Sequence, residues 1–197
     1  MKVLYDVQQR SELWFELREK RLTGSHSQAI GNCGKGLETY IKNKMSAYYS
    51  SAEKENYVNA DIQRGIDFED EAGAVYSWEK SVSIEKVGFV IYNEYVGCSP
   101  DLFAGDDGLC EIKCLNDNNH FNLLTGGEFE SKYLWQAQGQ MLVCEKEWCD
   151  LACYNPNFDQ SLFVKRVFPD QKKFDKLKEG FAMGEKLIKE IENKLKG

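Results

Sequence analysis

The sequence predicts a mixed α/β fold in which a central mixed sheet is flanked by helices. Segments with apolar residues at helical spacing alternate with short apolar runs that are bounded by turn residues. A chain of 197 residues with 42% hydrophobic and 29% charged residues is long enough to bury a core. We find no internal repeat, linker or low-complexity tract, so we expect a single domain over residues 1–197.

The first half of the chain is predicted to contain four helices. Ser11 is a good N-cap for a helix that runs to Arg21, and Thr23-Gly24-Ser25 opens a second helix to about Ile30. A glycine-rich loop leads to a third helix, and apolar residues at helical spacing mark a long fourth one. The helices are expected over residues 11–21, 23–30, 37–51 and 62–80.

The second half is predicted to supply the sheet. The last strand closes at Pro169 and reads as an edge strand, while residues 116–120 read as a polar loop. The final helix is amphipathic, and it is expected to pack on the sheet or on a neighbouring subunit. Strands are expected over residues 81–92, 96–101, 109–114, 148–154 and 161–168, and helices over 131–143 and 170–195.

One predicted hairpin carries the residues with the clearest chemistry. Gly105-Asp106-Asp107-Gly108 is a strong turn signal between two short apolar strands. Because side chains alternate along a strand, Glu111 and Lys113 project together. Cys110 and Ile112 take the opposite face, where they can fill a core.

Asp101 joins Glu111 only if the hairpin is irregular. A strict hairpin centred on the turn sets Asp101 opposite Ile112, on the wrong face. A bulge or a one-residue offset, at Gly105 or Gly108, brings Asp101 toward Glu111. The sequence leaves this pairing open.

An aspartate followed by Glu-x-Lys suits the metal-dependent cleavage of phosphodiesters. Asp101 and Glu111 offer hard oxygen ligands for Mg²⁺, which binds few carboxylates together with substrate phosphate and water. Lys113 beside them can orient the attacking water or help to deprotonate it. The pattern alone is weak, because many surface hairpins carry solvated Asp, Glu and Lys, and that is the alternative reading.

Polar side chains elsewhere fit the same chemistry. Glu69 borders an apolar stripe, where a buried carboxylate must be paired or bound to metal; a glutamate with its head in water is the alternative. Gln136 and Gln140 share one helix face at i, i+4. Arg18 and Ser25 lie beside a helix N-terminus that can hold a phosphate; an ordinary capping serine and a surface arginine are the alternative.

Composition limits the compartment and the mode of DNA binding. The net charge of −7 argues against a basic DNA-binding surface over the whole molecule, although a local positive groove is sufficient for an enzyme. No stretch is apolar enough to span a bilayer, and no signal peptide begins the chain. The seven cysteines are therefore interpreted as reduced, buried thiols in the cytosol, including the loosely spaced set Cys33, Cys144, Cys149 and Cys153.

The motifs resemble, in order, those of the phage lambda-type exonuclease family, the YqaJ-like viral recombinases of the PD-(D/E)XK nuclease superfamily. The core motif is similar to Cys98–Asp101 with Gly108–Cys114. The others are similar to Trp14–Arg18 with Leu22–Ser25, Arg64–Glu69, Gly126–Gly127 with Tyr133–Gln138, and Cys153–Pro156. Together they cover most of the chain, and an ordered set of five is far more specific than any single motif.

The resemblance implies a restriction-endonuclease-like core and a DNA exonuclease that uses two Mg²⁺ ions per site, which Mn²⁺ can replace. It implies 5′→3′ digestion of one strand of linear duplex DNA, which leaves a 3′ single-stranded overhang for phage recombination. The implied partners are a 5′-phosphorylated duplex end, further copies of the chain in a ring-shaped homotrimer, and a single-strand annealing protein. No membrane is involved, and the compartment is the cytoplasm of the host cell.

The resemblance also implies roles for individual residues. The residues implied in hydrolysis are Glu69, Asp101, Glu111, Lys113 and Gln136, with Asp101, Glu111 and the Ile112 carbonyl as metal ligands. The residues implied in binding DNA are Arg18 and Ser25 at the 5′-phosphate, Lys35 at the backbone and Ile62 as an apolar wedge. Leu102 and Leu115 depart from the family pattern, in which glycine and proline are common.

Two other classes of function stay open. A structure-specific, restriction- or repair-type endonuclease could use the same core, and it would cut a closed circle. A non-catalytic DNA-binding or nuclease-inhibiting relative could keep the fold, but the intact set Asp101, Glu111 and Lys113 argues against it.

Overall fold

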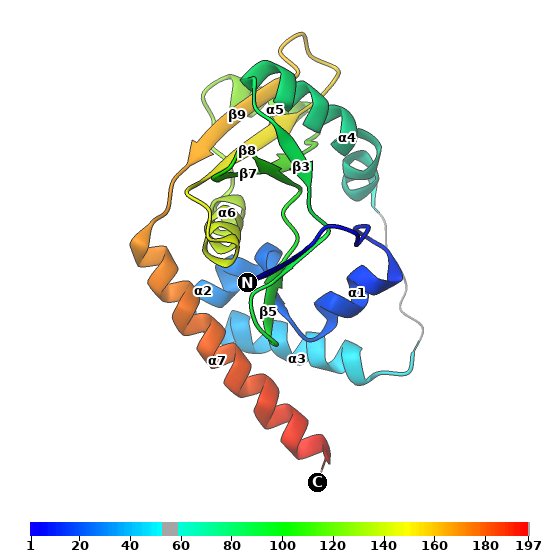
Figure 1. Ribbon diagram of the computed structural model, residues 1–197, viewed down its shortest axis with the longest axis vertical. Helices are drawn as coiled ribbons and strands as arrows, with labels where there is room; N and C mark the ends of the chain where they lie inside the picture. The colour runs from blue at the N-terminus through cyan, green and yellow to red at the C-terminus, as the bar shows by residue number, and fades with distance from the viewer. Residues whose placement is uncertain (53–58, 197) are drawn as a thin grey trace.

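The computed structural model describes residues 1–52 and 59–196, and a five-stranded mixed sheet forms the upper part of the molecule (Figure 1). Its strands β7 and β8 run parallel, and all other neighbours run antiparallel. The strand order is β3 (Ile84–Lys86), β6 (Leu102–Ala104), β7 (Gly108–Lys113), β8 (Trp148–Tyr154) and β9 (Leu162–Val167). The predicted mixed sheet is thus confirmed, and β9 is an edge strand as expected.

A second sheet of four short strands lies below the first. Its order is β1 (Lys2–Leu4), β4 (Phe89–Ile91), β5 (Val96–Cys98) and β2 (Leu22–Thr23). The single strand predicted over residues 81–92 is wrong, because β3 and β4 belong to different sheets. The predicted strand is interrupted at Gly88, where a Cβ atom would lie 2.1 Å from the Val7 carbonyl oxygen.

Helices cover both faces of the five-stranded sheet (Figure 1). On one face, α4 (Ala60–Lys80) contributes Tyr76 to a buried apolar cluster that includes Ile112. On the other face, α6 (Ser131–Cys144) contributes Met141 to the main core. The residues of β7 alternate between these two clusters, as the sequence predicted.

The remaining helices pack around α6 and the four-stranded sheet. Ser11 caps the first one by accepting the backbone N–H of Trp14 at 3.3 Å, as predicted. The predicted helix over residues 23–30 begins instead as a 3₁₀ turn (Gly24–His26). The helices are α1 (Glu12–Glu19), α2 (Ser27–Gly31), α3 (Lys35–Tyr49) and the long α7 (Gln171–Lys196).

The polar loop predicted at residues 116–120 is wrong, because this segment begins the helix α5 (Asp117–Leu124). Asn116 caps the helix by accepting the N–H of Asn119 at 3.0 Å. His120 is fully buried rather than solvated, and its ring nitrogens lie 3.1 Å from the Cys153 Sγ and 2.9 Å from a backbone carbonyl oxygen. A cap and tertiary packing hold a helix whose asparagine-rich sequence has low propensity.

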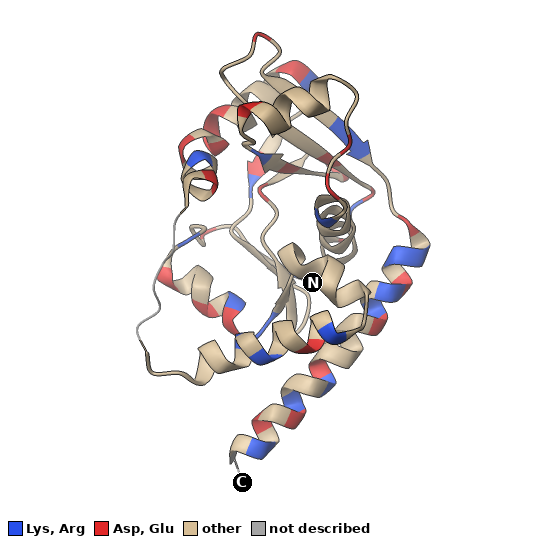
Figure 2. Ribbon diagram, turned by 180° about the vertical axis from the view of Figure 1, so that it is seen from behind, with Lys and Arg blue, Asp and Glu red and all other residues tan. Residues whose placement is uncertain are grey.

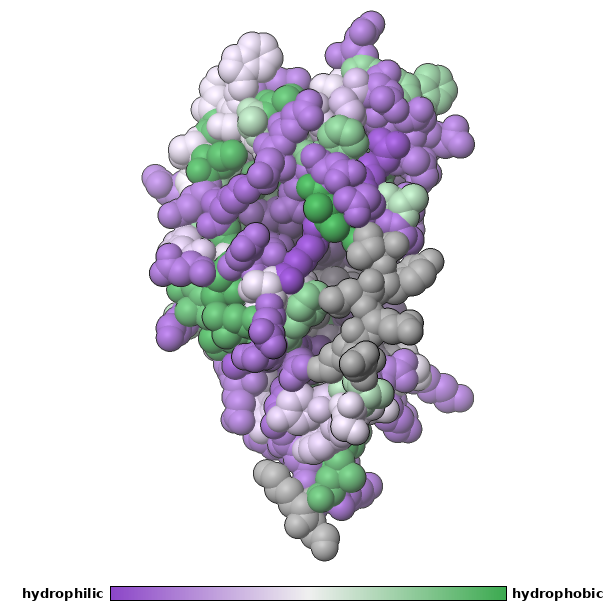
Figure 3. All heavy atoms as spheres, turned by 90° about the vertical axis from the view of Figure 1, so that its right-hand side faces the viewer, coloured by the Kyte–Doolittle hydropathy of each residue, from purple (hydrophilic) through white to green (hydrophobic). Residues whose placement is uncertain are grey.

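The surface is strongly polar. Figure 2 shows acidic residues gathered on α4 and residues of both charges along α7. The side that carries α1 and α4 is mainly hydrophilic, with scattered apolar groups (Figure 3). Trp78 on α4 is 81% exposed, and Tyr49 at the end of α3 is exposed as well. Among the described helices, none combines the length and the hydrophobicity that a bilayer crossing needs.

Candidate active site

The β6–β7 hairpin has the one-residue offset that brings two carboxylates together. Leu102 pairs with Cys110, so the same register continued by one residue sets Asp101 opposite Glu111. The connecting loop opens with Gly105, whose φ of +57° is the left-handed conformation that glycine adopts at low cost. The irregular pairing left open by the sequence is therefore an offset at the turn.

The departure at Leu102 leaves this arrangement intact. Leu102 continues β6, and its side chain lies in the cluster under α4, within 3.3 Å of the position that a Cβ on Gly73 would take. Asp101 precedes it and therefore projects to the other face. Leu115, the second departure, is partly buried against the main core.

Glu111 is a buried carboxylate with three donors. Only 2% of the residue is exposed. Its Oε1 accepts hydrogen bonds from the Lys113 ammonium at 2.6 Å and from the Gln136 amide at 2.5 Å, and its Oε2 accepts one from the Gln140 amide at 2.6 Å. A buried charge requires such donors. Helix α6 and strand β7 together therefore fix both oxygens of this carboxylate.

Gln140 is a site residue that the sequence reasoning missed. The sequence pattern sets Gln140 on one helix face with Gln136, and the i, i+4 spacing was the signal that both reach one target. Gln140 Oε1 is buried and has no hydrogen-bond partner among the described residues. Flipping the amide would set Oε1 against Glu111 Oε2, so its orientation is determined.

Burial and neighbouring charges shift the pKa values of Asp101 and Lys113. Burial raises the pKa of Asp101 well above its usual value, and Glu111 raises it further, while the Ile112 N–H donates to Asp101 Oδ2 at 2.7 Å. Burial disfavours the Lys113 cation, but Glu111 and Asp101 outweigh it and raise the pKa of Lys113. Lys113 is thus an ammonium at neutral pH, which favours orienting a water over removing its proton.

Glu69 reaches the edge of this group from α4. It lines a cavity of about 420 Å³ together with Asp101. Burial raises the pKa of the Glu69 carboxyl above its usual value. The nearby Arg10 charge opposes this shift, and the Glu111 charge adds to it. Its Oε2 lies 3.9 Å from the Arg10 guanidinium, and the structure records no direct bond from Glu69 to Asp101 or Glu111. Among the described residues, no three His, Cys, Asp or Glu side chains are grouped as a metal site, so two carboxylates form the core of the group.

The structure brings Arg18 and Ser25 together, and Ser99 joins them. The Arg18 guanidinium donates to the hydroxyls of Ser99 and Ser25, both at 3.4 Å. The Trp14 indole N–H also donates to the Ser99 hydroxyl at 2.8 Å, and Arg18 lies 4.2 Å from the Trp14 ring centre. The sequence reasoning missed Ser99, although it directly precedes Pro100-Asp101. This contact connects the Arg18 pair to the carboxylate hairpin.

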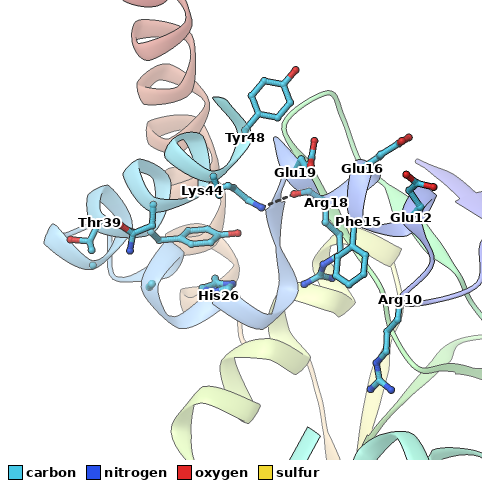
Figure 4. Close-up of a pocket in the computed structure, with 15 residues that line it drawn as sticks. Arg10, Glu12, Phe15, Glu16, Arg18, Glu19, His26, Thr39, Lys44 and Tyr48 are labelled. Atoms are coloured by element: carbon cyan, nitrogen blue, oxygen red, sulfur yellow. Dashed lines mark hydrogen bonds between the residues drawn. The ribbon is translucent and has the colours of Figure 1, made fainter. Parts of the chain in front are cut away.

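A second cavity, of about 1140 Å³, opens beside Arg18 between α1 and α3 (Figure 4). Lys44 crosses it and donates to the Arg18 carbonyl oxygen at 2.6 Å. His26 stacks on Tyr40 with ring centres 3.9 Å apart. Burial, together with the Lys44 and Arg18 charges, lowers the pKa of His26 to about 4, so it is neutral at physiological pH.

Lys35 and Ile62 are not brought to this group. Lys35 is exposed in the first turn of α3, and Ile62 is 40% exposed in the first turn of α4. Neither lines the cavities beside Arg18 and Asp101. The loosely spaced cysteines Cys144, Cys149 and Cys153 are buried, whereas Cys33 is only partly buried.

Comparison with known proteins identifies relatives of this arrangement. The family model described as YqaJ-like viral recombinase domain matches residues 13–147. An alkaline exonuclease, LHK-Exo, from Laribacter hongkongensis is similar at 26% identity and a TM-score of 0.80, over 94% of this chain and 98% of that one. Its complex with dAMP gives 28% identity and a TM-score of 0.82, over 93% and 95%.

More distant similarity is limited to the fold. A phage-related exonuclease from Haemophilus somnus 129PT shares 14% identity at a TM-score of 0.63, over 89% of this chain and 96% of that one. No curated protein sequence gives a significant match.

Proposed function

Since the chain belongs to the YqaJ-like viral recombinase family, we propose that it is a divalent-metal-dependent DNA exonuclease. It digests one strand of linear duplex DNA 5′→3′ and leaves a 3′ single-stranded overhang for phage recombination. One observation carries the proposal: the buried Glu111 is held by Lys113, Gln136 and Gln140 opposite Asp101. The similarity to alkaline exonucleases over almost the whole chain supports the reaction class.

The donor set fits Mg²⁺, with Mn²⁺ as a substitute. Asp101, Glu111 and the Ile112 carbonyl would hold two ions, and Mg²⁺ needs only one or two carboxylates besides phosphate and water. Burial and then the Glu111 charge raise the pKa of Asp101, and a cation would relieve the repulsion between the two carboxylates. Gln140 Oε1, which has no hydrogen-bond partner among the described residues, offers an acceptor for a bound water. When bound, the ions stabilise charge on the entering and leaving oxygens.

The protein side chains supply orientation and charge. Lys113 positions the attacking water and offsets the negative charge that develops on the phosphate. Gln136 and Gln140 hold Glu111 in one orientation, and Glu69 supports a water from the α4 side. The water oxygen attacks phosphorus while the bond from phosphorus to the 3′-oxygen breaks, so each cut releases a 5′-nucleotide from the end.

The 5′-phosphate is bound by Arg18, Ser25 and Ser99. Arginine recognises phosphate through several N–H donors in one plane, and the two hydroxyls provide further donors. The exposure of Lys35 and Ile62 suits their proposed roles, Lys35 at the DNA backbone and Ile62 as a wedge between separating strands.

The remaining proposals rest on the resemblance of the chain to its family. Residues 1–197 form one nuclease domain, three copies form a ring around DNA, and a single-strand annealing protein receives the product strand. A ring reduces the need for a basic surface, which accords with the net charge of −7. The reaction takes place in the cytoplasm of the host cell.

The use of DNA ends gives the direct test of this function. With Mg²⁺ we expect digestion of linear duplex DNA carrying a 5′-phosphate, slower digestion of the same DNA with a 5′-hydroxyl, and no cutting of a closed circle. Arg18→Ala should slow the digestion of the 5′-phosphorylated DNA and remove the preference for it over 5′-hydroxyl DNA. A time course on a gel measures both rates. Cutting of the closed circle would establish the endonuclease alternative instead.

Gln140→Met tests whether the second glutamine serves the metal site. Loss of its bond to Glu111 Oε2 should weaken Mn²⁺ binding by about 10- to 100-fold, as for other residues that orient metal ligands. Titration calorimetry measures this affinity. The matched control is Gln138→Met on the same helix: Gln138 donates to the Phe168 carbonyl at 2.8 Å and accepts the Asp170 N–H at 2.9 Å. That control should lower stability by about 1–3 kcal/mol and leave Mn²⁺ affinity unchanged. If Gln140→Met and Gln138→Met bind Mn²⁺ with the same affinity, Gln140 is not part of the metal site.

A further inference from the structure

Arg10 has a left-handed backbone conformation in the turn that precedes α1 and that the Ser11 N–H closes on the Gln8 carbonyl. Four described residues other than glycine have a positive φ: Arg10 (68°), Cys33 (50°), Ser81 (50°) and Glu145 (54°). The last three follow the C-terminal ends of α2, α4 and α6, where left-handed residues are common. Arg10 instead precedes α1, in a conformation that is disfavoured for any residue with a Cβ atom. Such an outlier at the edge of a candidate site is a reason to look for a function.

Contacts on both sides of Arg10 hold it there. The Gln9 amide donates to the Val87 carbonyl at 2.9 Å and to the Pro100 carbonyl at 3.1 Å, next to Asp101. The Ser11 N–H donates to the Gln8 carbonyl at 3.1 Å, and the Ser11 side chain caps α1. The turn is therefore tied both to the carboxylate hairpin and to the helix that carries Arg18.

The turn directs the Arg10 guanidinium to the junction of the two cavities. Arg10 lines the cavity that contains Glu69 and Asp101, and it also lines the larger cavity that contains Arg18. In Figure 4 the Arg10 side chain lies apart from Tyr48 and His26, at the opposite side of the view. The Arg10 side chain is 43% exposed, whereas Lys113 of the carboxylate hairpin is only 18% exposed and is already bonded to Glu111.

The ion pair between Arg10 and Glu69 is weak. The Arg10 Nη2 lies 3.9 Å from Glu69 Oε2, at the limit of an ion pair, and both side chains are in contact with solvent. A phosphate offers a planar guanidinium a closer, bidentate partner. Asp70, the neighbouring carboxylate on α4, is already paired with Lys86. DNA that approaches the acidic group of Glu69, Asp101 and Glu111 therefore meets an exposed arginine with a loose partner.

We propose that Arg10 binds a backbone phosphate of the DNA at the junction between the Arg18 cavity and the carboxylate hairpin. The inference rests on the proposed nuclease function and adds a DNA contact to it. Transfer of the guanidinium from Glu69 to the phosphate also releases Glu69 to support a water. The turn fixes the backbone from which the Arg10 side chain extends before the DNA arrives, which lowers the entropy lost on binding.

Arg10→Gly separates a DNA contact from a structural role. Glycine relieves the left-handed strain, so the variant should unfold at the wild-type temperature or above it. Its affinity for 5′-phosphorylated duplex DNA should fall about tenfold, and the slope of log Kd against log salt should decrease by about 0.9, the value for one phosphate contact. Arg10→Lys should keep most of the salt slope. Fluorescence anisotropy in Ca²⁺, with DNA shown to be intact on a gel, gives these values.

Two control variants match the two changes. Ser81→Gly relieves a left-handed residue at the end of α4, and Lys186→Ala removes an exposed charge on α7. Both should bind DNA like the wild type. If Arg10→Gly binds with wild-type affinity and slope while the wild type digests DNA, Arg10 is only a counter-charge for Glu69 and this inference is wrong. If the wild type neither binds nor digests DNA, the nuclease proposal is wrong as well.

Discussion

Replacing Lys113 with alanine is expected to reduce Mg²⁺-dependent DNA digestion by about 10²–10⁴-fold, the range for a positioned catalytic group. Lys113 donates to Glu111 Oε1 at 2.6 Å, and its ammonium stays charged because Glu111 and Asp101 raise its pKa. The variant loses the one cation that contacts the carboxylate pair directly in the described part of the chain. Initial rates on 5′-phosphorylated linear duplex DNA measure the effect.

The chain offers a control lysine just after α6, beside the turn of the same hairpin. Lys146 donates to the Asp106 carbonyl and lies 4.7 Å from the Phe103 ring centre. Lys146→Ala should digest DNA at the wild-type rate, and far-ultraviolet circular dichroism should show both variants folded. Wild-type digestion by a folded Lys113→Ala protein would exclude the assigned role.

Asp101→Asn is expected to abolish digestion without loss of stability in the absence of metal. Asparagine can keep the hydrogen bond from the Ile112 N–H, since its carbonyl oxygen takes the place of Oδ2. It removes the charge that Glu111 repels. Because the folded Asp101 carboxyl binds its proton more tightly than the unfolded one, ionisation of Asp101 destabilises the fold as the pH rises through its pKa. The variant should therefore unfold at or above the wild-type temperature at neutral pH in EDTA.

Thermal unfolding with and without Mn²⁺ distinguishes this role from a structural one. Wild type should gain stability with Mn²⁺, and Asp101→Asn should gain little or none. Asp150 is the contrasting buried aspartate, because it accepts two hydrogen bonds from Arg166 and one from Tyr76, each at 2.8 Å. Asp150→Asn should unfold at a lower temperature and keep the Mn²⁺ effect. A clear Mn²⁺ effect in Asp101→Asn would contradict its assignment as a ligand.

The sequence pattern predicted the structure correctly where residues close in sequence decide the conformation. The period-two alternation of β7 placed Glu111 and Lys113 on one face, and the apolar run of residues 148–154 is β8 itself. Ser11 identified the start of α1 because a cap depends on groups three residues away. The order of five motifs identified the family, which the match over residues 13–147 confirms.

The sequence pattern did not predict the structure where contacts between residues distant in sequence decide the conformation. The division of residues 81–92 between two sheets depends on the close approach of the Val7 carbonyl to Gly88, 81 positions apart. Helix α5 depends on the burial of His120 beside Cys153. The part that Gln140 plays at Glu111 depends on how α6 is rotated over β7, which the helix sequence alone does not determine.

The most direct test of the account is an anomalous difference map from a crystal of the wild-type protein soaked in Mn²⁺. The account predicts peaks between the Asp101 and Glu111 carboxylates, beside the Ile112 carbonyl, and their loss in Asp101→Asn. A protein that digests DNA while its Mn²⁺ peaks lie elsewhere, with these two carboxylates turned apart, would contradict it.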